Sequence, residues 1–176
     1  MENSYTHINV KDLTENVFKL VDDDWMLITA GKDNDFNTMT ASWGGFGILW
    51  HKPVSFIFIR PQRYTYEFAE KYNFYTLSFF EEKYRGALQL CGSSSGRDVN
   101  KAEQTGLTPS QTEHKNIFFR EARLIMECRK LFRSDFSPEH FVDSKLIKEA
   151  YPKSDFHRMY IGEVISCMIK NNLSSK

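Results

Sequence analysis

The sequence predicts a mainly β protein built as an antiparallel barrel, with short helices between its strands. Strand-length segments rich in β-branched and aromatic residues recur along the chain, and Val54–Arg60 is the strongest of them. The helical patterns between these segments are few and short, which favours an antiparallel barrel over a doubly wound parallel sheet. A length of 176 residues without an internal repeat or a linker-like stretch is typical of one domain, so we expect a single domain over residues 1–176.

The N-terminal half of the chain alternates strands with turns. Trp25–Ala30 and Val54–Arg60 are apolar enough to be buried strands. Gly44 and Gly45 interrupt another β-forming stretch and indicate a bulge or a close approach of two backbones. In chain order we expect a helical turn within 12–20, strands at 25–30, 38–43, 46–50 and 54–60, and turns at 31–35 and 51–53.

The C-terminal half mixes helices with strands. Thr65 suits the N-cap of a short helix, because its hydroxyl can accept a hydrogen bond from an unpaired amide of the first turn. Pro138 is typical of the first turn of another short helix. We expect helices at 65–72 and 81–90, a Gly/Ser loop at 91–100, a short helix from 137, and strands at 73–79, within 117–132 and at 159–170.

Composition and charge exclude several classes of protein. Lysine plus arginine and aspartate plus glutamate both number 23, so the zero net charge argues against a nucleic-acid binder with a broad basic face. No apolar run approaches the ~18 residues of a membrane-spanning helix. Three widely spaced cysteines without a CxxC pair, together with a polar start of the chain, predict reduced thiols and a cytoplasmic protein. The five histidines lack metal-ligand spacing, so we expect no metal site.

The segment RPQRYT at residues 60–65 is the first candidate binding site. Arg60 ends a strand and therefore belongs at the rim of the barrel, where Pro61 breaks the strand. Arg63 precedes a helix whose first amides are unpaired and carry partial positive charge. An arginine, the Thr65 hydroxyl and a helix start together form a cradle for a phosphate. The alternative is that both arginines pair with surface carboxylates and that Thr65 only caps its helix.

The segment NTMTAS at residues 37–42 is the second candidate. Thr38, Thr40 and Ser42 alternate, so their hydroxyls share one face of a strand. Such a face suits a flat polar ring that needs hydrogen bonds and close contact with the backbone. The alternative is the solvent-facing side of an edge strand. Taken with the arginine segment, it indicates a phosphorylated ligand with a flat polar ring.

The segment CGSSSGRDVNK at residues 91–101 is the third candidate. Arg97 and Lys101 provide two cations with which a Gly/Ser loop would close over an anion, although the spacing of a Walker loop is absent. The alternative is a mobile surface loop. Cys91 has no neighbouring thiol and no activating partner, so we expect a small buried cysteine.

Five segments occur in an order that resembles the flavin reductase-like family and its flavoredoxin-type relatives: TMTASWG, RPQRYT, CGSSSGRDVNK, GLTP and HRMYIGEV. The resemblance covers most of the chain, with a core of about 25–169. It implies an FMN-binding split β-barrel with antiparallel Greek-key topology. It also implies a homodimer with the cofactor near the interface, and a two-fold pair would cover strand edges that an isolated barrel exposes.

The resemblance also assigns roles to individual residues. It implies that the flavin ring lies against the first of these segments and that the phosphate lies near the second, while Lys101 approaches the flavin. His157 matches a residue that lies toward the ring in some relatives and is the catalytic candidate, although a lone histidine before a strand is more often a structural donor. Asn100 departs from the acidic residue that relatives often have there. The cofactor-binding candidates are Asn37, Thr38, Met39, Thr40, Ala41, Ser42, Arg60, Pro61, Arg63, Tyr64, Thr65, Arg97 and Lys101.

The activity implied by the resemblance is that of an NAD(P)H-dependent flavin reductase. A GxGxxG fingerprint is absent, so NAD(P)H would dock transiently on the flavin, attracted by Arg97 and Lys101 near solvent. The electrons would pass to a free flavin, a ferric chelate or a redox protein acceptor. Two alternatives stay open: a non-enzymatic FMN electron carrier, and a flavin-storing or flavin-sensing barrel without turnover.

Overall fold

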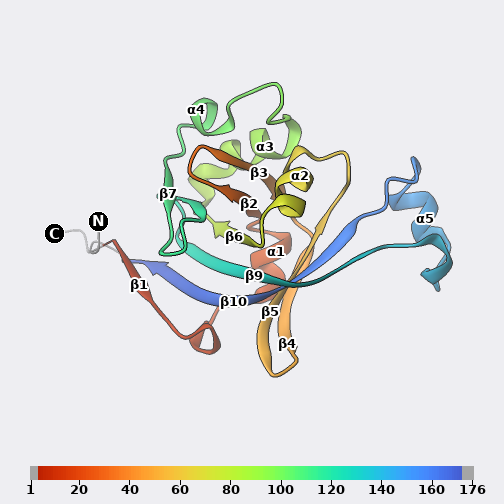
Figure 1. Cartoon of the computed structure of the whole chain (residues 1–176), viewed down its shortest axis with the longest axis horizontal. Coiled ribbons are helices and arrows are strands. Elements are labelled where there is room, and N and C mark those ends of the chain that lie inside the picture. The colour runs from red at the N-terminus through yellow and green to blue at the C-terminus, as the bar shows by residue number, and fades with distance from the viewer. Residues whose placement is uncertain (1–3, 172–176) are drawn as a thin grey trace.

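The computed structural model describes residues 4–171, which form an antiparallel sheet that curls into a barrel (Figure 1). Eight strands belong to this sheet, in the order β3-β2-β6-β9-β10-β5-β4, with β1 paired to β10. A separate two-stranded sheet joins β7 to β8. The strands are β1 (Tyr5–His7), β2 (Met26–Lys32), β3 (Asp35–Ala41), β4 (Gly44–Leu49), β5 (Lys52–Ile59), β6 (Phe74–Phe79), β7 (Pro109–Gln111), β8 (Ile117–Phe119), β9 (Leu124–Asp135) and β10 (Arg158–Lys170).

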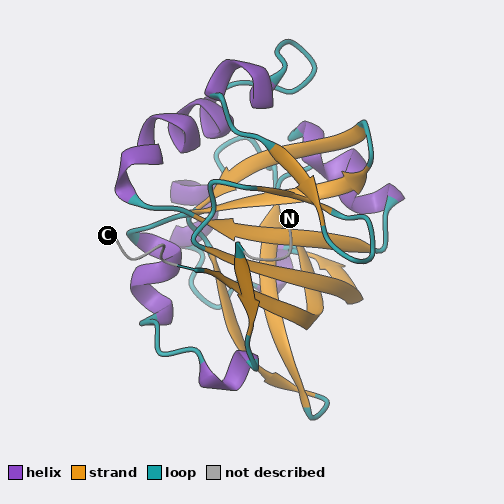
Figure 2. Cartoon of the chain, turned by 90° about the vertical axis from the view of Figure 1, so that its left-hand side faces the viewer, coloured by secondary structure: helices purple, strands orange, loops and turns teal. Residues whose placement is uncertain are grey.

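Short helices surround the strands rather than alternating with them (Figure 2). Helix α2 packs on β2 and β3, α3 packs on β3, and α1 contacts β4. Figure 1 shows α3 and α4 close together beside the β2–β3 hairpin, and α2 covers the other face of this hairpin, because Ile28 packs with α2 whereas Leu27 packs with α3. The helices are η1 (Val10–Asp12), α1 (Val17–Asp22), α2 (Tyr64–Lys71), η2 (Glu82–Tyr84), α3 (Arg85–Ser93), α4 (Lys101–Thr105), η3 (Pro138–His140) and α5 (Lys145–Ala150).

The barrel is split between two strands that follow each other in sequence. β3 and β4 are joined by Ser42 and Trp43 alone, yet they occupy opposite ends of the sheet. Each therefore keeps one edge that no other strand of the described chain pairs with. The predicted mainly β, Greek-key split barrel is confirmed, and the edge of β3 is where backbone groups stay available for a ligand.

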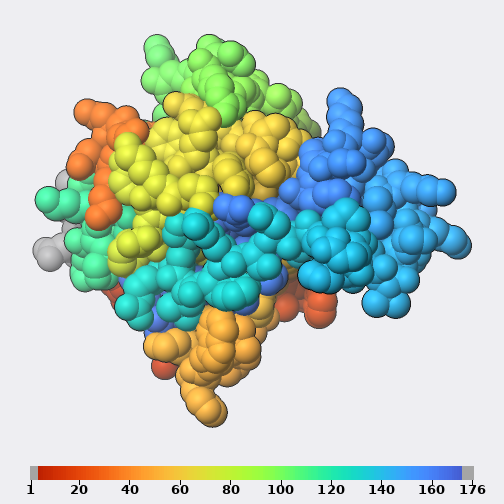
Figure 3. Space-filling view, turned by 45° about the vertical axis from the view of Figure 1, so that its right-hand side comes forward, coloured from red at the N-terminus to blue at the C-terminus, as the bar shows by residue number. Residues whose placement is uncertain are grey.

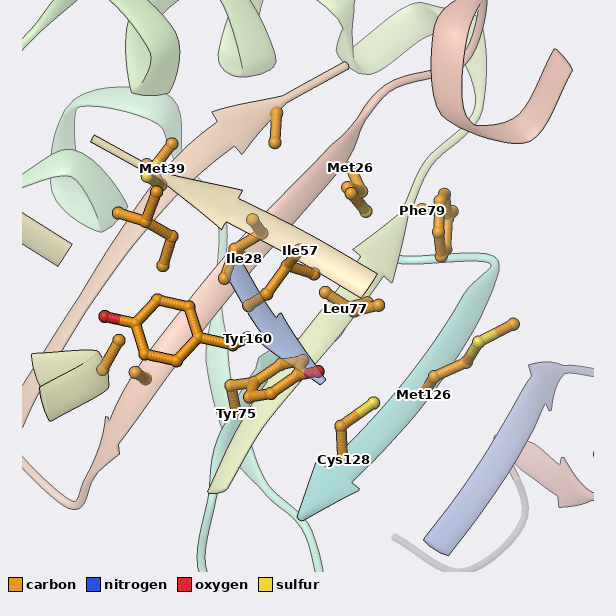
Figure 4. Close-up of a cluster of buried hydrophobic side chains, with 14 of the residues drawn as sticks. Met26, Ile28, Met39, Ile57, Tyr75, Leu77, Phe79, Met126, Cys128 and Tyr160 are labelled. Carbon is orange, nitrogen blue, oxygen red and sulfur yellow. The ribbon is translucent and has the colours of Figure 1, made fainter. Parts of the chain in front are cut away.

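Two buried tyrosines fill the middle of the barrel (Figure 4). The Tyr75 hydroxyl hydrogen-bonds the Ser55 hydroxyl at 2.7 Å, and the Tyr160 hydroxyl donates to Glu70 at 2.7 Å. Buried phenol groups need such partners, because an unpaired hydroxyl in an apolar core costs about 1–3 kcal/mol. A Cβ placed on Gly162 would lie 2.3 Å from the Tyr75 oxygen, so only glycine leaves room for this ring.

Local structure departs from the sequence predictions at several turns. Gly44 and Gly45 lie inside β4, and the break between strands falls at Ser42–Trp43 instead. The β4–β5 turn is formed by Trp50 and His51, both in the left-handed region with φ of 52° and 58°. That turn suits a two-residue hairpin, whose central residues need positive φ. Residues 91–93, predicted as loop, form the last turn of α3.

The chain between β9 and β10, residues 136–157, is called the arm here. It contains η3 and α5 and projects from one end of the barrel (Figures 1 and 3). Aromatic contacts hold it together, with ring centroids 4.8 Å apart for Tyr151–Phe156 and 5.8 Å apart for Phe141–Tyr151. A further contact, Phe58–Phe136 at 5.4 Å, attaches the arm to β5. The arm thus has a small apolar cluster of its own, separate from the barrel core.

Candidate functional site

The outer edge of β3 carries the first element of the candidate site. The Thr38 carbonyl accepts hydrogen bonds from Lys101 Nζ at 2.8 Å and from Asn37 Nδ2 at 3.4 Å. It therefore points away from β2. Because the N–H and C=O of one residue in an antiparallel strand face the same side, Thr38 and Thr40 present their backbone groups along this edge. The Thr38 carbonyl is already occupied by Lys101 and Asn37, so the backbone groups that this edge offers are the Thr38 N–H and those of Thr40.

A buried asparagine joins three segments of the chain at this edge. Asn37 Nδ2 donates to the Thr65 hydroxyl at 2.7 Å, which ties β3 to α2. A Cβ on Gly96 would lie 1.9 Å from Asn37 Oδ1, so glycine allows the loop after α3 to touch the same side chain. The sequence prediction that Thr65 caps its helix is wrong: Arg63 occupies the N-cap position of α2, and Thr65 is fully buried.

Two cations converge beside this edge without a carboxylate partner. Lys101 Nζ donates to the Cys91 carbonyl at 2.9 Å, and Arg63 donates to the Gly92 carbonyl at 2.7 Å and to Cys91 at 3.5 Å. Their acceptors are the last carbonyls of α3, the negative end of that helix. Within residues 4–171, neither Arg63 nor Lys101 lies within 4.0 Å of a carboxylate.

Burial sharpens the effect of this unpaired charge. Lys101 is only 6% exposed, and burial, reinforced by the charge of Arg63, lowers its pKa to about 8. Burial also lowers the pKa of Arg63. A buried and a half-buried cation without a counter-charge form a site where an anion is strongly favoured. We call Asn37, Thr38, Arg63, Gly96 and Lys101 the edge site.

A pocket of about 390 Å³ lies between the edge of β3 and the segment 96–102. Its lining residues include Asn37, Thr38, Gly96, Arg97 and Lys101. Two of the three segments that the sequence singled out, 37–42 and 91–101, therefore line this pocket, and Arg63 of the third segment contacts the second through the Gly92 carbonyl. Lys101 is nevertheless the first residue of α4 and faces the interior, so the expectation that it lies near solvent on a flexible loop is wrong.

The other two arginines of the prediction are already neutralised. Arg60 forms an ion pair with Asp155 of the arm and donates to the Ala150 carbonyl at 2.8 Å. Arg97 forms an ion pair with Glu67 and stacks on Tyr64, with its guanidinium 4.5 Å from the ring centroid. For Arg60 the predicted alternative, pairing with a surface carboxylate, applies; Arg97 is paired as well, and the binding roles of both residues stay predictions.

Most of the chain matches a known protein family. The flavin reductase like domain matches residues 22–176. The chain belongs to the flavin reductase-like family. No curated protein sequence matches it. Within the part of the chain that the structure describes, no helix is long and apolar enough to cross a membrane.

Three solved structures illustrate the fold of this flavin reductase-like chain. An FMN-binding domain of a flavin reductases-like enzyme from Shewanella baltica OS155 has a TM-score of 0.68 at 16% identity, covering 99% of this chain and 83% of that one. Flavoredoxin of Desulfovibrio vulgaris (Miyazaki F) has a TM-score of 0.65 at 19% identity, covering 92% and 76%. An NADH:FAD oxidoreductase of Streptomyces globisporus C-1027 has a TM-score of 0.62 at 14% identity, covering 84% and 77%. At such identities the likeness establishes the fold.

The hydroxyls of the flavin reductase-like segment 37–42 serve the protein itself. Thr38 Oγ1 lies 2.9 Å from the Thr29 hydroxyl, and Thr40 Oγ1 donates to the Leu88 carbonyl at 2.5 Å. Met39 and Ala41 face the barrel core, and Ser42 lies beyond the end of β3. The edge of this strand therefore offers its backbone, rather than the row of hydroxyls that the sequence predicted.

His157 lies outside the edge site, beside Trp43 in the connection between β3 and β4. Its ring is 5.3 Å from that of Trp43, and Nδ1 is 2.9 Å from the Tyr151 hydroxyl. Sequence reasoning missed Tyr151 and Asp155, which hold His157 and Arg60. The only signal for them was the run of aromatic residues in the arm, which does not reveal its partners.

Proposed function

We propose that this flavin reductase-like protein binds FMN at the edge site and transfers electrons through it. The observation that carries the proposal is the pair Arg63 and Lys101, a half-buried and a buried cation without a carboxylate partner beside the first turn of α2. A phosphate at this position would gain both charges and the partial positive charge of the helix start. The outward backbone groups of Thr38 and Thr40 suit the polar edge of a flavin ring.

The compact size of the cation pair supports FMN rather than a dinucleotide. Both side chains reach the carbonyl of one residue, Cys91, so they would converge on a single phosphate. The solved relatives include an FMN-binding domain and an NADH:FAD oxidoreductase, so both flavins occur among proteins of this fold.

A bound flavin would supply the hydride- and electron-transfer chemistry, while the protein orients the ring and shapes its surroundings. We propose NAD(P)H as the transient reductant and a free flavin, a ferric chelate or a redox protein as acceptor. The chain contributes no nucleophile to this scheme. Arg63 and Lys101 bind, and Asn37 keeps β3, α2 and the loop around Gly96 in register.

Titration of the protein with FMN and riboflavin tests the binding proposal. We expect one FMN per chain and markedly weaker binding of riboflavin, which lacks the phosphate. Lys101→Met should weaken FMN but hardly change riboflavin, and Lys19→Met, on the distant helix α1, is the matched control. Equal affinities for FMN and riboflavin would contradict a phosphate at Arg63 and Lys101.

Anaerobic reduction separates the enzyme from the electron carrier. Flavoredoxin is among the relatives of this fold, and so a carrier that reacts slowly with nicotinamide is the second candidate. Faster bleaching of bound FMN by NADH or NADPH than of free FMN supports the reductase. No acceleration by either nucleotide favours the carrier or the flavin-storing alternative.

We also propose that the protein is a homodimer. The unpaired edge of β4 and the exposed side chains of Ile48, Trp50 and Phe132 would be protected in a two-fold pair. Sedimentation should give twice the 20.7 kDa of one chain. A monomer at micromolar concentration with FMN bound would contradict it. Free, buried cysteines fit the proposed cytoplasmic location.

A further inference from the structure

A buried hydrogen bond links the arm to His157. The Tyr151 hydroxyl and His157 Nδ1 are 2.9 Å apart, and His157 is only 8% exposed. The two rings meet edge to face, with centroids 5.5 Å apart. Neither residue belongs to the edge site, so this contact calls for a separate explanation.

The direction of this bond follows from the partners available. Within residues 4–171, the Tyr151 hydroxyl has no other hydrogen-bond partner. If His157 donated from Nδ1, the tyrosine proton would be buried without an acceptor, at a cost of about 1–3 kcal/mol. If Tyr151 donates, both groups are satisfied at this contact. The tyrosine is therefore the donor, and a neutral His157 carries its proton on Nε2.

Burial is the main reason that the imidazole stays neutral. The Arg60 guanidinium lies 5.2 Å from the Tyr151 ring centroid, and Asp155 of the arm pairs with Arg60. Burial and, to a smaller extent, the charge of Arg60 lower the pKa of His157, Asp155 raises it, and together they bring it to about 4. At neutral pH the ring is therefore an uncharged donor at Nε2.

We propose that Tyr151 is a positioning residue, which fixes His157 as a neutral Nε2–H donor for an acceptor atom of a planar ring bound beside Trp43. The Trp43 residue is 50% exposed, and its ring is 5.3 Å from that of His157, so a flat ligand can reach this side of the pair. The acceptor belongs to a flavin or a nicotinamide, as a carbonyl oxygen or a ring nitrogen. This last assignment rests on the proposed function, whereas the tautomer does not.

Imidazole nitrogen NMR of the flavin-free protein tests the tautomer directly. In the unmodified protein, His157 should carry its proton on Nε2 and stay neutral from pH 5 to 8, a range chosen around the ordinary histidine pKa of about 6.5. The remaining histidines serve as internal controls in the same spectrum. A proton on Nδ1, or titration of His157 inside this range, overturns the proposal without any variant.

Tyr151→Phe then tests the positioning role, because it keeps the ring and removes only the hydroxyl. The His157 signals should shift toward a mixture of tautomers. Reduction of bound FMN by NAD(P)H should slow by about tenfold at saturating nucleotide, the lower end of what such orienting contacts contribute. FMN affinity should change much less than in Lys101→Met, because no hydrogen bond or ring contact joins Tyr151 to Arg63 or Lys101.

The matched control is Tyr72→Phe, which removes a hydroxyl bonded to Asp35 on the surface and should change neither readout. An unchanged tautomer in Tyr151→Phe overturns the proposal, and so does an unchanged rate despite a shifted tautomer. A protein that binds no FMN defeats the proposed function while the NMR result for His157 stands. The two failures are therefore distinguishable.

Discussion

Arg60 and Arg63 lie at the two ends of one turn, but within the described chain only Arg60 has a carboxylate partner. The turn is closed by a hydrogen bond of 3.0 Å from the Arg63 amide to the Arg60 carbonyl. Arg60 faces the arm, where Asp155 neutralises it. Arg63 faces the edge site, where its neighbour is another cation, Lys101. Where the charges are paired, no further ion is needed to neutralise them, whereas unpaired cations favour the binding of an anionic ligand.

Replacing each arginine with alanine tests this contrast, and we expect the largest effect on FMN affinity from Arg63→Ala. Arg63→Ala should weaken FMN binding by ~1.5–3 kcal/mol, the contribution of a hydrogen bond to a charged group. Arg60→Ala should leave FMN affinity within about threefold, because its charge is already matched by Asp155. Fluorescence titration with FMN measures both, with riboflavin as the ligand that should be insensitive to either change. Comparable losses in the two variants would remove the distinction.

Thr65→Val sharpens the assignment within the edge site. The side chain is buried and accepts a hydrogen bond from Asn37, so its loss should leave a buried amide unsatisfied. We expect the free energy of unfolding to fall by about 1–3 kcal/mol, measured by urea denaturation. FMN affinity should change much less than in Arg63→Ala. A larger loss of FMN binding than of stability would mean that Thr65 contacts the phosphate itself.

The pH dependence of Lys101 gives an effect of intermediate size. Its pKa falls from about 10.5 to about 8 in the folded protein. Between these values the unfolded chain holds a proton that the folded chain has released, so the stability contribution of this group rises with pH. FMN affinity should fall over the same interval, by about tenfold, because the protonated amine is the better phosphate partner.

Titrations with FMN and urea at pH 7 and pH 9.5 would show these opposite trends. Lys101→Arg stays charged between pH 7 and pH 9.5, so it should reduce the pH dependence of both the stability and the FMN affinity. An FMN affinity that does not change with pH in the unmodified protein would place the phosphate away from Lys101.

Asp155→Asn probes the paired region and should have the smallest effect. The ion pair with Arg60 is about a fifth exposed, so its removal should cost at most ~1 kcal/mol of stability. Arg60 would then resemble Arg63 in lacking a carboxylate. Urea denaturation and FMN titration should show a small loss of stability with FMN affinity unchanged.

This contrast also shows how far sequence reasoning reaches. The order of strands and short helices could be predicted, because β-forming segments and turns are local patterns. The sequence does not show which of Arg60 and Arg63 is paired with a carboxylate, because the partner of Arg60, Asp155, lies 95 positions further along the chain. The same holds for Thr65, whose role as an acceptor depends on Asn37 in another strand.

Sequence patterns also mislead where a residue type has two uses. Threonines at 38 and 40 suggested a polar binding face, but their hydroxyls bond to Thr29 and to the Leu88 carbonyl of α3. Lys101 looked like a surface cation, and only the packing of α4 against β3 and α3 reveals its burial. Such features arise from contacts between segments, which no single window of sequence contains.

The close fit between Gly162 and Tyr75 restricts how this sequence can diverge. A Cβ at position 162 would lie 2.3 Å from the tyrosine oxygen, and it would still lie 2.7 Å from Cζ and 2.9 Å from Cε1. Phenylalanine at position 75 would therefore not make alanine acceptable at 162. A lineage can change position 162 only after losing the ring altogether, at the expense of a cavity in the core. The two positions behave as one evolutionary unit, and strong epistasis between them is expected in any mutational scan.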